Sequence, residues 1–245
     1  MAWLAPVGSS VSGVWIADGD GTSARCLVDP ARTRVENPAL GNHHTGNPAM
    51  PLGERFAFSD LTFAPDGREL YFEDYGWGTS RALYAVAIDT GAVRFVLDAN
   101  AYRAVDSCRD ASLVGRILTY EHSHWDPLPG AVADWYFLAD PQGKRLGIVG
   151  PAEENVQRFM ARRCGQGEAP PEVPREPVPP SLRGGSRTCG NIRFEHRALP
   201  FLDGTTYDIY VVFEGGRVGN TLTRRADIDP MLRDVCEAHR PSRHR

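Results

Sequence analysis

The sequence predicts a mainly β protein built from short antiparallel strands, and two patterns carry that prediction. The first lies in residues 59–98, where four short apolar runs alternate with residues that favour turns. Pro65-Asp66-Gly67 predicts a tight turn, because proline fixes φ and glycine accepts a positive φ. Four antiparallel strands in about 40 residues is the size of one β-propeller blade.

The second pattern is repetition. Residues 14–28 consist of an apolar strand, an Asp/Gly turn and a returning strand, and so repeat the hairpin of residues 83–97. The chain is therefore expected to begin part-way through a blade, which a terminal strand often completes in a closed propeller. In all, the sequence predicts three or four blade-like units, with one or two short helices.

Two later stretches each predict a strand, a hairpin and a helix. The strands are expected at residues 115–122 and 190–196, the hairpins at 134–149 and 207–219, and the helices at 153–163 and 229–239. The first helix has acidic residues at its start and places Val156, Phe159 and Met160 on one face. The second is expected to begin with Asp229 as N-cap and Pro230 in its first turn.

The motifs in the first pattern point to a family. APDGRELYF, followed by LYAVAIDTGAVRFVL, resembles the TolB-type β-propeller repeat, in which Ser-Pro-Asp-Gly precedes an apolar strand and a Leu-Tyr-x-x-Asp-x-x-Thr-Gly hairpin. Ala64 stands where that repeat usually has serine. The resemblance covers this one blade well and implies a propeller fold, but it implies no particular activity, since a fold does not determine function.

Composition limits the classes of partner. The chain has 245 residues and a formal net charge of −4, so nothing in its charge favours nucleic acid. No stretch approaches the roughly 20 apolar residues of a membrane helix. The N-terminus, whose first basic residue is Arg25, does not read as a signal peptide.

Domain organisation follows from a change in composition. Residues 166–187 are rich in proline and glycine and almost free of aliphatic side chains, which predicts a linker. The sequence thus predicts a propeller-like β domain over residues 1–165, the linker, and a hairpin-plus-helix unit over residues 188–245 that would form a further blade.

The five cysteines fall on the two strand–hairpin–helix stretches. Cys108 and Cys189 each precede a strand, whereas Cys164 and Cys236 each lie at a helix. Pairing within each stretch predicts the disulfides Cys108–Cys164 and Cys189–Cys236 with Cys26 free, and Cys164–Cys189 across the linker is the rival pairing. Disulfides favour a periplasmic or secreted protein; five reduced cysteines in a cytoplasmic protein is the alternative.

One constellation could bind a metal. On a strand, His122 and His124 face the same side, so that both imidazoles could contact one ion. Oligogalacturonate lyases are similar in having TolB-like blades and a His-x-His pair on the metal, a resemblance that implies His122 and His124 as ligands. Thr119 stands where those lyases have a glutamine, and their seven blades need a longer chain. The alternative is a strand-end pair bonded to backbone or solvent.

Other catalytic signatures are missing from the sequence. It contains no Gly-x-Ser-x-Gly elbow, no phosphate-binding Gly-rich loop and no calcium-loop pattern. No catalytic or cofactor-binding residue is therefore predicted. The function expected is that of a non-catalytic, extracytoplasmic binding or scaffolding protein with a protein or cell-envelope partner. The alternative is a polysaccharide lyase or hydrolase that uses a divalent metal at His122 and His124.

Overall fold

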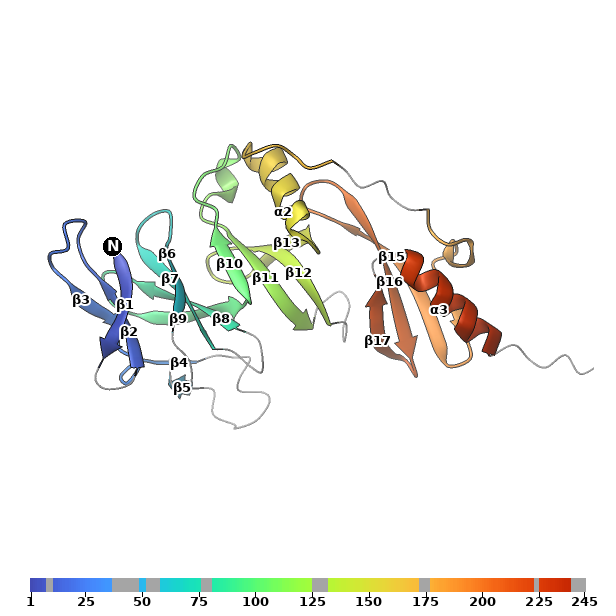
Figure 1. Ribbon diagram of the computed structural model, residues 1–245, viewed down its shortest axis with the longest axis horizontal. Coiled ribbons are helices and arrows are strands. Elements are labelled where there is room, and N and C mark those ends of the chain that lie inside the picture. The colour runs from blue at the N-terminus through green and yellow to red at the C-terminus, as the bar shows by residue number, and fades with distance from the viewer. Residues whose placement is uncertain are drawn as a thin grey trace, which may run out of the picture. The chain divides into compact units, whose positions relative to one another are not determined.

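The fold is mainly β, as the sequence predicts. The computed structural model describes residues 1–7, 11–36, 49–51, 58–75, 81–124, 132–171, 177–222 and 225–238 (Figure 1). These residues form a three-stranded sheet, a two-stranded ribbon and three four-stranded sheets, in each of which neighbours in the sequence are neighbours in the sheet. The alternation of apolar runs with turns produces this order, because short turns pair consecutive strands.

The strands are as follows. The first sheet contains β1 (Ala2–Val7), β2 (Val11–Ile16) and β3 (Arg25–Val28), and the ribbon β4 (Arg34–Glu36) and β5 (Ala49–Pro51). The second sheet contains β6 (Ser59–Phe63), β7 (Glu69–Tyr75), β8 (Arg81–Ala87) and β9 (Val93–Asp98). The third contains β10 (Ala101–Ala104), β11 (Ile117–His124), β12 (Val132–Ala139) and β13 (Arg145–Gly150), and the fourth β14 (Ser186–Cys189), β15 (Ile192–Pro200), β16 (Thr206–Glu214) and β17 (Arg217–Leu222).

The chain divides into two compact units. One comprises Met1–Glu121, Tyr136–Gly147 and Arg163–Gln166, and the other His122–Trp135, Ile148–Arg162 and Gly167–Arg245. The boundary thus passes through β11, β12 and β13. The domain boundaries predicted from composition stay a prediction.

In the first unit, the second sheet is covered on both faces. Phe72 on β7 packs into a core shared with the first sheet. Its neighbour Tyr71 points to the opposite face, into a core shared with Ile117 and Ala139 of the third sheet. Burial on two faces explains why residues 70–72 of β7 and 82–87 of β8 are continuously apolar instead of alternating.

The turn between β6 and β7 is the one that the sequence predicts. Gly67 has a φ of +69°, and its backbone N–H donates to the carbonyl oxygen of Ala64 at 2.8 Å. The Asp66 carboxylate accepts from the backbone N–H of Arg68 at 3.0 Å, which closes the turn further.

In the second unit, a helix covers one face of the fourth sheet (Figure 1). Ile228 and Leu232 of α3 (Arg225–Ala238) pack with Phe194, Tyr210 and Val212 of β15 and β16. The predicted start of this helix was wrong: it begins at Arg225, and Pro230 lies inside it. Proline is common near helix starts, but the apolar contacts of the preceding turn extend this helix backwards past Asp229.

The other predicted helix is confirmed. α2 (Glu153–Phe159) continues into the π-helical turn Met160–Cys164, and its predicted apolar face is buried. The Asn155 side chain accepts a hydrogen bond from the backbone N–H of Ala152 at 3.1 Å and thereby fixes the helix start.

Both predicted cysteine pairs lie at disulfide distance. The Cα atoms are 4.1 Å apart in Cys108–Cys164 and 4.9 Å apart in Cys189–Cys236, and Cys26 is a free thiol. Each bond joins the chain near the end of a sheet's first strand to the helical segment that follows its fourth strand: Cys108 follows β10, and Cys189 is the last residue of β14. The third and fourth sheets therefore have equivalent disulfide connections to the helical segments that follow them.

Part of the Pro/Gly-rich segment belongs to the folded structure. Leu182, in the 3-10 turn Pro180–Leu182, is fully buried among Phe194, Tyr210 and Leu232. At the other end of the segment, Gln166 donates to the carbonyl oxygen of Ser107 at 2.6 Å.

Neither helix of the described residues has the length and apolarity that crossing a membrane requires.

Candidate functional site

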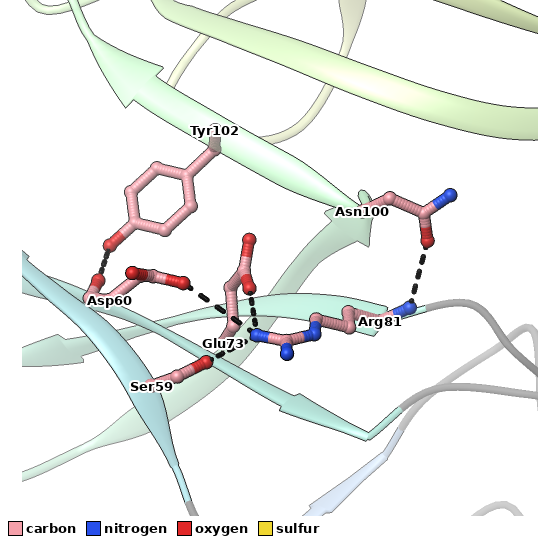
Figure 2. Close-up of polar contacts among 6 residues, drawn as sticks. All are labelled: Ser59, Asp60, Glu73, Arg81, Asn100 and Tyr102. Carbon is pink, nitrogen blue, oxygen red and sulfur yellow. Dashed lines mark hydrogen bonds and ion pairs between the residues drawn. The ribbon is translucent and has the colours of Figure 1, made fainter.

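Six polar residues gather at one end of the second sheet, in the first compact unit. They come from the start of β6, the end of β7, the start of β8 and the beginning of β10 (Figure 2). The six are Ser59, Asp60, Glu73, Arg81, Asn100 and Tyr102. They converge because antiparallel pairing brings the end of β7 beside the starts of β6 and β8.

Glu73 is the buried centre of this group. It pairs with Leu83 across β7 and β8 and shares its sheet face with Tyr71, so it points toward the core between the second and third sheets. Its side chain is 1% exposed, and Oε1 has no hydrogen-bond partner. A buried carboxylate oxygen without a partner raises the free energy of the charged form.

Arg81 holds the other oxygen of Glu73. Its Nη1 lies 2.8 Å from Glu73 Oε2, 2.6 Å from Ser59 Oγ and 3.6 Å from Asp60 Oδ2 (Figure 2). The Arg81 backbone N–H donates to Asn100 Oδ1 at 3.3 Å. One half-exposed guanidinium therefore serves two carboxylates, and it extends from the buried Glu73 to solvent.

Asp60 connects the second sheet to β10. The register of β6 and β7 shifts between Ser59 and Thr62, and Asp60 adopts a φ of +52° in this bulge. Its backbone carbonyl then accepts a hydrogen bond from the Tyr102 hydroxyl (Figure 2). Aspartate tolerates the left-handed region better than most residues, which fits it to this position.

Burial decides the charge state of Glu73. Desolvation raises the pKa of Glu73 to about 7, with Arg81 lowering that pKa and the neighbouring Asp60 raising it. Burial also raises the pKa of the Tyr102 hydroxyl. Glu73 therefore gains or loses its proton near neutral pH, whereas an exposed glutamate is ionised throughout that range.

A second buried carboxylate lies on the facing sheet. Glu121 on β11 is 1% exposed, accepts from Thr119 Oγ1 at 3.0 Å and pairs with Arg145. Burial and the charge of Glu121 together raise the pKa of Asp98, at the end of β9, to about 6, although Arg145 acts to lower it. We use the name polar seam for both sets of residues, Asp60, Glu73 and Arg81 in the first and Asp98, Glu121 and Arg145 in the second.

The chemistry open to the polar seam is proton exchange. Two of its carboxyl groups titrate near neutrality, as catalytic acids and bases do. Glu73 Oε1 is shielded from solvent by the packed sheets, however, so a substrate reaches it only if they separate. Among the described residues, no group of three or more His, Cys, Asp or Glu side chains is placed to hold a metal ion.

The predicted metal ligands lie at the end of β11. His122 and His124 both belong to this strand, but their side chains lie outside the described part of the structure. A metal at these residues stays a prediction.

Sequence reasoning missed a histidine–aspartate pair in the fourth sheet. His196 Nε2 lies 2.6 Å from Asp208 Oδ1 across β15 and β16, and the His196 ring contacts Tyr210 with centroids 5.6 Å apart. A sequence signal exists for it. The residues Glu195, His196, Asp208 and Tyr210 have counterparts of the same types and at the same spacing earlier in the chain, at positions 121, 122, 134 and 136.

Comparison with protein-family models finds no match, and comparison with curated proteins finds none either.

Proposed function

We propose that the chain is a non-catalytic, extracytoplasmic binding or scaffolding protein built on TolB-like β-propeller repeats. The observation that carries this proposal is the pair of disulfides, each of which joins a helical segment to its own four-stranded sheet. Disulfides of this structural kind persist in the periplasm or outside the cell and are rare in the reducing cytoplasm.

The sheet architecture supports the repeat part of the proposal. Each four-stranded sheet is a simple meander, and the second sheet is covered by a neighbouring sheet on either face. Blades of a propeller pack in this manner, face against face. Such a stack is rigid and presents its loops at the sheet ends, where binding proteins carry their contact residues.

The partner class follows from charge and compartment. A formal net charge of −4 favours a protein or cell-envelope partner over nucleic acid. Phe63 and Leu146 are large apolar side chains with 41% and 42% exposure, and they mark two places at which a partner could be probed.

The compartment is tested by treating intact cells with a maleimide and completing the reaction under denaturing conditions. When no reductant is added, the proposal expects one maleimide per chain, at Cys26. When the protein is reduced before labelling, it expects five. Five free thiols in the unreduced sample would refute the extracytoplasmic assignment. A Cys26→Ala variant is the control and should bind none before reduction.

Binding is tested by placing a photo-crosslinking amino acid at Phe63 or Leu146 in cells. A binding protein gives a discrete cross-linked species from at least one of these sites. The matched control is the same amino acid at exposed Asp106, on the chain segment between β10 and β11. The absence of discrete adducts at both apolar sites, or the same adducts from all three sites, would count against a specific partner.

A further inference from the structure

We propose that the polar seam is a pH-sensitive contact between the second and third sheets, which is closed when Glu73 and Asp98 are protonated and loosened when they ionise. The inference goes beyond the proposed binding function and does not depend on it. Its geometric basis is Glu73, a side chain that is buried between two packed sheets with one oxygen unpartnered.

Glu73 shares its cation with a second acid. The Arg81 guanidinium lies within ion-pair distance of both Glu73 and the exposed Asp60. Around Glu73, the facing titratable groups are Asp60 on β6, Arg81 on β8 and the neutral Tyr102 on β10. When Glu73 ionises, Arg81 is shared between two carboxylates and the charge of Glu73 lies in a poorly solvated place, which is costly.

The same groups connect the two sheets. The Tyr102 hydroxyl bonds to the Asp60 carbonyl, and Asn100 accepts from the Arg81 backbone; both pairs link the second sheet to the start of the third. Ionised Glu73 Oε1 gains a hydrogen-bond partner only if water enters, and water enters only if β10 moves away from β6 and β7. Ionisation therefore favours opening at this place.

The direction of the pH dependence follows from the raised pKa values. Glu73 has a pKa of about 7 in the closed state against an ordinary value of 4.5, and Asp98 about 6 against 3.8. A raised pKa stabilises the closed state fully below the ordinary value, and that stabilisation is lost as the pH rises through the raised value. The seam should close toward pH 5 and loosen toward pH 8.

Hydrogen exchange measured by mass spectrometry tests this in the full chain. After correction for intrinsic rates, protection of residues 59–63 and 101–104 should fall by at least about tenfold between pH 5.5 and pH 8. In Glu73→Gln, which mimics the protonated acid, the fall should shrink to less than about fivefold, the part left to Asp98. The matched control is Glu69→Gln on the same strand, whose partner Arg94 lies outside the seam; it should keep the wild-type dependence.

A second variant tests the proposal independently, in case Glu73→Gln does not fold. Asp60 is 65% exposed, and asparagine also tolerates its positive φ, so Asp60→Asn should fold normally. Removing this charge lowers the pKa of Glu73 in the closed state, so the fall in protection should be smaller and should end at a lower pH than in the wild type. Equal behaviour of Glu73→Gln and Glu69→Gln, or an unmoved midpoint in Asp60→Asn, would overturn the proposal.

Discussion

His196 and Asp208 face each other across β15 and β16 with 2.6 Å between Nε2 and Oδ1. Both side chains are largely buried, at 16% and 9% exposure. They stand diagonally in the antiparallel ladder, because His196 is directly opposite Tyr210 and Asp208 opposite Ala198. The pair therefore supports this register with a specific contact between the two longest strands of the fourth sheet.

Replacing His196 with phenylalanine should destabilise the chain by about 1–2 kcal/mol, because Asp208 loses this hydrogen bond at a buried position. Urea unfolding measures the change. In a double-mutant cycle with Asp208→Asn, the two substitutions should cost less together than the sum of their separate effects. Strict additivity would show that the two side chains do not stabilise each other.

Gly143 lies close to the backbone of another chain segment, so a side chain at this position should lower the stability of the fold. A Cβ at Gly143 would lie 1.9 Å from the backbone oxygen of Val96, whereas a Cβ at Gly67 would meet nothing within 4 Å. Both glycines have a positive φ, so Ala carries the same backbone penalty of about 1 kcal/mol at either position. Gly143→Ala should therefore destabilise by about 2 kcal/mol more than Gly67→Ala. Equal melting temperatures for the two variants would contradict this.

The local pattern was enough to predict the strands of the second sheet and the turn at Gly67. Each depends on neighbouring residues, since proline, aspartate and glycine set the turn whatever surrounds it. The cysteine pairs followed from repeated positions, because a cysteine before a strand and another at a helix recur in both stretches. The same repetition contained the His196–Asp208 spacing, which only the structure made evident.

The start of α3 and the role of Glu73 depend on contacts between distant segments. Pro230 favours a helix start locally, but Ile228 is fully buried in the core of the fourth sheet and extends the helix backwards. Glu73 follows Leu70, Tyr71 and Phe72 in a strand covered on both faces, so no polar face was left for it. Alternation within one strand cannot show that both faces are covered.

Metal content decides between the proposed function and the lyase or hydrolase alternative. Protein purified without chelator should contain well under one equivalent of transition metal per chain by elemental analysis. A His122→Ala/His124→Ala double variant should contain the same amount. One equivalent in the wild type that is lost in the double variant would favour the metal-dependent enzyme.

Limited digestion with trypsin tests the disulfide pattern, because the expected cleavage sites lie between the two disulfide-bonded stretches. Arg183 follows the buried Leu182 in a 3-10 turn, so local anchoring should slow cleavage there. Arg175 lies outside the described residues, and from the proline-rich sequence around it we expect the first cut there. Both positions lie between Cys164 and Cys189.

With the pairs Cys108–Cys164 and Cys189–Cys236, the nicked chain should give two fragments on a denaturing gel without reductant. A Cys164–Cys189 bridge would hold the halves together until reductant is added, so a single band would contradict the pairing. Each loop, of 56 and 47 residues, contributes about 4 kcal/mol in the chain-entropy model. Cys189→Ser/Cys236→Ser should therefore unfold at much lower urea than wild type, whereas Cys26→Ala, which keeps both bonds, should not.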